Sequence, residues 1–83
     1  MELSGKIDCI TVENNNGNDK KVVTLVNGRE ILFVEFQGKN IQLLDEYHTG
    51  DDVTVQVRFN GKVSGLGRKY NNIIAKRIAL IAN

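Results

Sequence analysis

The chain has 83 residues, with 11 lysines and arginines against 10 aspartates and glutamates, and a single cysteine. This length suits one domain, near the size at which a single hydrophobic core can hold a fold. One cysteine, Cys9, excludes a disulfide framework and a cysteine-based zinc site. No apolar run approaches the roughly 20 residues of a membrane helix, and no secretion signal opens the chain. We therefore expect a soluble protein of the reduced cytoplasm, with no membrane partner.

The charges are unevenly distributed along the chain. All ten acids lie in residues 1–52, whereas residues 53–83 hold bases and no acid. A polyanion is the partner that this asymmetry favours, provided that folding keeps the two halves apart. Solvated surface charge is the alternative interpretation. The bases of the second half are Arg58, Lys62, Arg68, Lys69, Lys76 and Arg77.

Apolar residues recur with a period of two over the first part of the chain, as in half-buried strands. The first strand is expected over residues 2–12, followed by a polar loop rich in Asn and Gly over residues 13–20. Two further strand-like runs flank Asn27-Gly28, the strongest short signal of a two-residue hairpin turn. We expect this turn to pair Val26 with Arg29.

The hairpin predicts two different faces, because directly opposed residues share a face. The core face carries Val23, Leu25, Leu32, Val34 and Phe36. The outward face carries Lys20, Val22, Thr24, Ile31, Phe33, Glu35 and Gln37. An apolar patch of Val22, Ile31 and Phe33 on an outward face requires a partner.

A short helix is predicted over residues 40–48, with Asn40 as its cap and Gly50 as its terminator. Its apolar residues should plug one end of the sheet. A fourth strand over residues 51–60 alternates cleanly, and an open basic loop is expected over residues 61–69. The residues expected in the helix plug are Ile41, Leu44 and Tyr47, and those expected inward on the fourth strand are Val53, Val55, Val57 and Phe59.

The last strand begins at Tyr70 and contains an irregularity near Lys76-Arg77. Its expected core residues are Ile73, Ala75, Ile78 and Leu80. Five strands with one short α-helix between the third and fourth form the order of an oligonucleotide/oligosaccharide-binding barrel. The predicted fold is therefore an all-β, five-stranded antiparallel barrel formed by residues 1–83.

Parts of the sequence also resemble known families. VEFQGKNIQLLDEYHTGDDVTVQVRF and RKYNNIIA are similar to segments of bacterial single-stranded DNA-binding proteins, and MELSGKI resembles the start of a family of short, functionally uncharacterised bacterial proteins with the same barrel. The resemblance implies a homo-oligomer, dimer or tetramer, of chromosomal or phage origin. It would bind single-stranded DNA in replication, recombination or repair, with little sequence preference and no cofactor.

Two departures from that family bear on the expected affinity for nucleic acid. Gln37 stands where the family has an aromatic residue before the Gly-Lys pair, and the basic loop lacks a Trp. Stacking on aromatic platforms contributes roughly 1–3 kcal/mol per base, so binding should be weaker and more dependent on charge. Phe33 and Tyr70 are the aromatic residues placed to compensate.

The candidate site joins these aromatic residues, for bases, with cations for phosphates. Phe33 could instead pack with Val22 and Ile31 in a subunit interface, and Tyr70 could be a buried aromatic at the start of a strand. Lys76 and Arg77 could serve only to keep an outer strand soluble. The candidate nucleic-acid-binding residues are Phe33, Arg58, Lys62, Arg68, Lys69, Tyr70, Lys20 and Lys21.

Other functions have less support. Catalysis by acid, base or nucleophile needs paired groups, and the chain offers one histidine, His48, one cysteine and scattered carboxylates without metal-loop spacing. We therefore expect no enzyme. The main alternative is a protein-interaction barrel of a replication or repair assembly that docks another chain on the outward apolar patch. A carbohydrate or small-ligand barrel is a third class, and the choice between DNA and RNA stays open.

Overall fold

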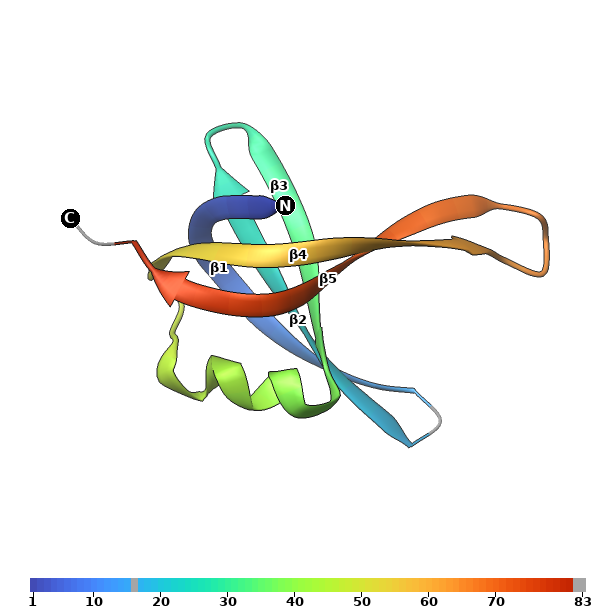
Figure 1. Cartoon of the computed structure of the whole chain (residues 1–83), viewed down its shortest axis with the longest axis horizontal. Helices are drawn as coiled ribbons and strands as arrows, with labels where there is room; N and C mark the ends of the chain where they lie inside the picture. The colour runs from blue at the N-terminus through green and yellow to red at the C-terminus, as the bar shows by residue number, and fades with distance from the viewer. Residues whose placement is uncertain (16, 82–83) are drawn as a thin grey trace.

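The computed structural model describes residues 1–15 and 17–81. Its strands are β1 (Glu2–Asn15), β2 (Asn18–Asn27), β3 (Glu30–Gln37), β4 (Asp52–Val63) and β5 (Lys69–Leu80), with a 3₁₀ helix, η1 (Gly38–Glu46), between β3 and β4. The strands close into a barrel in the order β1-β2-β3-β5-β4 (Figure 1). The predicted barrel of the oligonucleotide/oligosaccharide-binding type is confirmed. One detail differs, because the closing pair of strands, β3 and β5, is parallel.

The β2–β3 hairpin turns one residue later than expected. Asn27 pairs with Glu30 and Val26 with Ile31, so Gly28 and Arg29 form the turn, and Gly28 takes the left-handed backbone conformation at φ 62°. The Asn27 side chain donates to the Ser4 carbonyl on β1, 3.0 Å away. The predicted register is therefore wrong by two residues, but an even shift leaves every side chain on its predicted face.

The barrel interior is filled by the apolar face of the strands. Leu32 is only partly buried but packs against this core. Burying these side chains supplies most of the stabilisation of so small a domain, at about 25 cal/mol per Å² of apolar surface. The core residues are Ile7, Val23, Leu25, Val34, Phe36, Leu44, Val53, Val55, Val57 and Ala75.

Helix η1 closes one end of the barrel, as expected. Leu44 is buried, Ile41 and Tyr47 pack against the core, and the Tyr47 hydroxyl donates to the Ile78 carbonyl at 3.1 Å. The predicted cap is wrong, because Asn40 lies inside the helix and its side-chain amide donates to the Ala75 carbonyl of β5 at 3.1 Å. The helix is of the 3₁₀ type and ends at Glu46, before the expected His48.

Two segments predicted as loops belong mostly to strands. Backbone pairing continues to Asn15↔Asn18 between β1 and β2, and to Val63↔Lys69 between β4 and β5. The turn between β4 and β5 is closed by a hydrogen bond from the Ser64 amide to the Arg68 carbonyl at 2.8 Å. Backbone ladders thus override the polar composition on which the loop predictions rested. The outer part of the β4–β5 hairpin projects from the barrel (Figure 1), and we call residues 59–73 the arm.

Two predicted core residues lie outside the core. Phe59 keeps the inward side of β4, opposite Ile73, but is 51% exposed, because the packed interior ends at Val57. Leu80 is also exposed, at the end of β5. The irregularity predicted near Lys76-Arg77 is present.

In that irregularity, Ala75 and Arg77 oppose the adjacent residues Val57 and Gln56. Lys76 is therefore the extra residue of a β-bulge in β5.

Among the residues described, no helix is long and apolar enough to cross a membrane.

Candidate nucleic-acid interface

The outward face of β1, β2 and β3 carries the candidate residues in rows set by the backbone pairing. Glu13 lies opposite Lys20, and Lys20 lies opposite Gln37. In the next rows Val22 opposes Glu35 and Thr24 opposes Phe33. Opposed residues share a face, so these side chains all belong to one outward surface.

Phe33 is a prominent feature of this surface. Its side chain lies on the outward face with 61% of the residue exposed, and Ile31 next to it on the same face is 59% exposed. Val22 is half-buried. An aromatic ring so exposed on a sheet is free to stack on a planar ligand or to pack against a second chain.

A groove of about 500 Å³ runs past Phe33, where β3 meets β5. These two strands pair only at Val34↔Ile73 and Glu35↔Ile74, so the arm side of β5 departs from β3 beyond that point. We call this the outer groove. It is lined by Glu13, Lys20, Val22, Ile31, Leu32, Phe33, Glu35, Asn71, Asn72 and Ile73.

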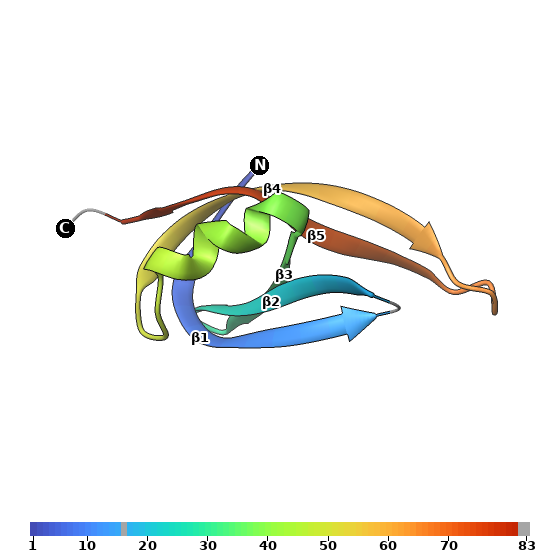
Figure 2. The ribbon, with the colours of Figure 1, turned by 90° about the horizontal axis from the view of Figure 1, so that it is seen from below.

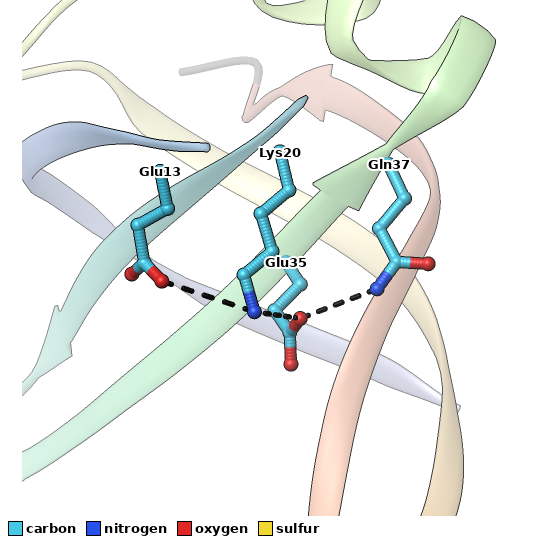
Figure 3. A network of polar contacts seen from close by, with 4 residues as sticks. All are labelled: Glu13, Lys20, Glu35 and Gln37. Atoms are coloured by element: carbon cyan, nitrogen blue, oxygen red, sulfur yellow. Dashed lines mark hydrogen bonds and ion pairs between the residues drawn. The ribbon is translucent and has the colours of Figure 1, made fainter. Parts of the chain in front are cut away.

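Glu13, Lys20 and Glu35 of the outer groove form a polar network with Gln37 (Figure 3). Lys20 Nζ lies 2.9 Å from Glu35 Oε1 and 3.9 Å from Glu13 Oε1. The Gln37 side-chain amide donates to the same Glu35 Oε1 at 3.2 Å. Glu35 is 8% exposed, so its charge is largely withdrawn from water and depends on these partners.

The network changes the protonation of its lysine. The hydrogen bond with Glu35 raises the pKa of Lys20 above its ordinary value of 10.5, with smaller contributions from the charges of Glu35, Glu13 and Tyr70, while burial opposes the rise. Lys20 therefore stays charged and held by carboxylates. A phosphate would have to compete with Glu35 for it.

A second hollow, of about 810 Å³, adjoins the first. The tip of the β1–β2 hairpin, the start of η1 and the arm all contribute to it, and Lys20 lines both hollows. Figure 2 shows the β1–β2 hairpin and the arm projecting toward the same side of the molecule. The two hollows therefore share Lys20 and both include residues of the arm, and we call the two together the path from the outward sheet face to the arm. The second hollow is lined by Gly17, Asn18, Asp19, Lys20, Gln37, Gly38, Ile41 and Lys62.

The arm presents cations and an aromatic ring together. Lys62 lies opposite Tyr70, and Lys69 lies opposite Val63. Tyr70 is 48% exposed, which contradicts the alternative that it is a buried aromatic at the start of a strand. Lys62, Lys69 and Tyr70 line a shallow hollow on the arm. Within residues 1–15 and 17–81, neither lysine forms an ion pair.

The remaining predicted cations are more scattered. Arg58 is exposed on β4, opposite Ile74, and Arg68 lies in the turn at the tip of the arm, where its amide donates to Ser64 Oγ at 3.1 Å. Lys21 lies opposite Phe36, on the other side of β2 from Lys20. None of these three side chains lines the outer groove or the second hollow.

The sequence interpretation missed several residues of the outer groove and the second hollow. Glu35 and Gln37 are predicted on the outward face but in no site, and their place on the same face as Lys20 is the signal that could have found them. Asn71 and Asn72 carry no signal of their own. For metal binding, the described part of the chain contains no group of three or more histidine, cysteine, aspartate or glutamate side chains that could hold an ion.

Comparison with models of known protein families and with curated protein sequences finds no match to this chain.

Proposed function

We propose that this barrel binds single-stranded nucleic acid along the path from the outer groove to the arm. The observation that carries the proposal is the exposed ring of Phe33 in a groove that leads to an arm with cations and no acid. Single-stranded DNA in replication, recombination or repair is the substrate and setting that the sequence resemblance favours.

Bases would stack on the aromatic residues of this path. Phe33 and Tyr70 each expose about half of their surface or more, and neither is needed to fill the core. Stacking of a base on such a ring contributes about 1–3 kcal/mol and tolerates every base, because all bases have a π-face.

Phosphates would lie along the arm. Lys62 and Lys69 form no ion pair within the described residues, so contact with a phosphate would break no existing bridge. The carboxylates of Glu13 and Glu35 lie on the sheet side of the path and would repel phosphate there. These charges favour an orientation in which the bases of the nucleic acid lie over the sheet and its sugar–phosphate backbone follows the arm.

The test is a titration of a fluorescent dT oligomer of about 12 nucleotides, at increasing salt, with anisotropy as the readout. The logarithm of the binding constant should fall linearly with the logarithm of salt, by about 0.7 for each phosphate contact. Charge reversal of Arg68 and Lys69 together should weaken binding to every sequence. Failure to bind at low salt rejects the proposal, and a matched uridine oligomer compares RNA with DNA.

A second function is favoured by one observation, the adjacent exposure of Ile31 and Phe33 on the outward face beside Val22. Such a patch suits a subunit interface, in a homodimer or homotetramer, or an accessory subunit docked on another protein. Phe33→Asp should then change the molecular mass in solution and leave residual oligonucleotide binding on the arm. Light scattering on the sample used for the salt titration separates the two functions.

A further inference from the structure

The outer groove contains a carboxylate where a polyanion is proposed to bind. Glu35 is nearly buried and lines the groove together with Phe33. Two like charges a few ångströms apart repel each other near a protein surface, so a phosphate is disfavoured beside Glu35. The group that occupies this position should therefore be neutral and should donate hydrogen bonds.

The hydrogen bonds already made leave acceptor capacity on Glu35. Lys20 and Gln37 both donate to Oε1 (Figure 3), and no side chain or amide of the described residues donates to Oε2. A carboxylate accepts up to about four hydrogen bonds, and a lysine ammonium donates three. Glu35 and Lys20 thus offer a neighbouring acceptor and donor to a ligand.

The distance from this pair to Phe33 suits one nucleobase. Phe33 and Glu35 are two residues apart on the same face of β3, which corresponds to about 6.5 Å along the strand. A base stacked on the Phe33 ring extends its edge over that distance. The groove can therefore hold the ring of a base on Phe33 and its hydrogen-bonding edge at Glu35 and Lys20.

Resting on the proposed function, we propose that the outer groove binds guanine in preference to the other bases. Its Watson–Crick edge carries two adjacent donors, N1–H and the N2 amino group, for the Glu35 carboxylate, and its O6 accepts from Lys20. Thymine and uracil present one donor between two acceptors, and adenine and cytosine present one amino group beside an acceptor. Guanine is therefore the base that matches both members of the pair.

The experiment compares dT oligomers of about 12 nucleotides with the same oligomers carrying one central dG, dA, dC or deoxyinosine, by anisotropy at low salt. Strand sliding lets a single guanine reach the groove. We expect dG to tighten binding about fivefold or more relative to dT, dA and dC. Deoxyinosine keeps N1–H and O6 but lacks the N2 amino group, so it should lose most of the gain. This comparison uses the unaltered protein, so it does not depend on the folding of a variant.

Two matched variants locate the preference. Glu35→Gln should abolish the gain from dG, with folding checked by circular dichroism. Glu30→Gln makes the same chemical change on β3 at a residue that lines neither hollow, and it should keep the gain. Equal affinity for all substituted oligomers, a gain that deoxyinosine retains, or a gain that survives Glu35→Gln overturns the preference alone. Lack of binding to every oligomer overturns the proposed function, and the preference with it.

Discussion

Lys20 and Glu35 lie diagonally across the β2–β3 ladder, with Lys20 Nζ 2.9 Å from Glu35 Oε1. The pair joins an outward-facing lysine to a carboxylate that is almost fully withdrawn from water. A buried carboxylate without a counter-charge is costly, whereas a neutral amide in its place costs much less. The two residues should therefore be coupled in stability.

Replacement of Lys20 by Met should lower the free energy of unfolding by about 2–3 kcal/mol, because it leaves Glu35 charged and short of a donor. The double variant Lys20→Met/Glu35→Gln should recover part of that loss, since the charge is gone. Urea denaturation at neutral pH measures both. Equal stability of the single and double variants would show that the charge of Glu35 carries no cost once Lys20 is absent.

The same pair predicts a dependence on alkaline pH. The hydrogen bond to Glu35 raises the folded-state pKa of Lys20 above 10.5, so its stabilising contribution is fully present below pH 10.5 and is lost as the pH rises through the folded value. The difference in unfolding free energy between the natural protein and Lys20→Met should be constant from neutral pH to about pH 10.5 and should shrink above it. Denaturation series at several alkaline pH values test this, and a difference that grows with pH would contradict it.

Phe33→Ala should weaken oligonucleotide binding by about 1–3 kcal/mol through loss of one stacking platform. Stability should change little, because the ring is mostly exposed. Ile31→Ala is the matched control, since Ile31 is equally exposed on the same face but offers no ring. Anisotropy at low salt measures the effect, and equal losses in the two variants would speak against stacking.

The arm cations should determine the salt dependence of binding. Lys62→Gln combined with Lys69→Gln should reduce the slope of the log–log salt plot by about 0.7 for each phosphate that is no longer neutralised. Lys76→Gln combined with Arg77→Gln makes the same change in charge at the β-bulge, away from both hollows, and should leave the slope unchanged. Similar slopes for the two double variants would place the phosphates elsewhere.

Two phenylalanines with similar sequence patterns should differ sharply in their contribution to stability. Phe36→Ala should cost about 3–5 kcal/mol, because the ring is fully buried in the barrel. Phe59→Ala should cost well under half of that, since Phe59 lies on the arm beyond the packed core. Chemical denaturation measures the unfolding free energy of both variants. A loss of stability in Phe59→Ala comparable to that in Phe36→Ala would mean that the arm packs against another surface in solution.

The period-two pattern predicted which face each hairpin residue occupies, but not how far each face is covered. Phe59 and Leu80 follow the inward alternation of their strands and are nevertheless exposed. Alternation of apolar and polar residues shows which side of a strand each side chain faces. Burial also requires that other parts of the protein cover that side chain. That cover depends on where the other strands end, which no local pattern encodes.

The sequence predicted only part of the candidate site, because a local pattern gives the face of a residue but not its neighbours. The outward position of Phe33 follows from the hairpin alone, and an even error in register left it unchanged. The pairing of Lys20 with Glu35 could not be read from a count of charges, because it depends on the register between residues of two strands. The lengths of the β1–β2 hairpin and the arm were also missed, since Asn, Gly and Lys carry little strand propensity of their own.

The barrel is completed by only two residue pairs between β3 and β5, Val34↔Ile73 and Glu35↔Ile74. Because this β3–β5 seam is so short, it should be the first part of the barrel to open. Its amides should exchange with deuterium faster than those of the long β1–β2 and β4–β5 ladders. The outer groove straddles this seam, with residues from both strands in its wall. A nucleic-acid strand bound in the outer groove would contact both β3 and β5 and so hold these two strands together. Binding should therefore slow amide exchange in β3 and β5 before it does so in the other strands.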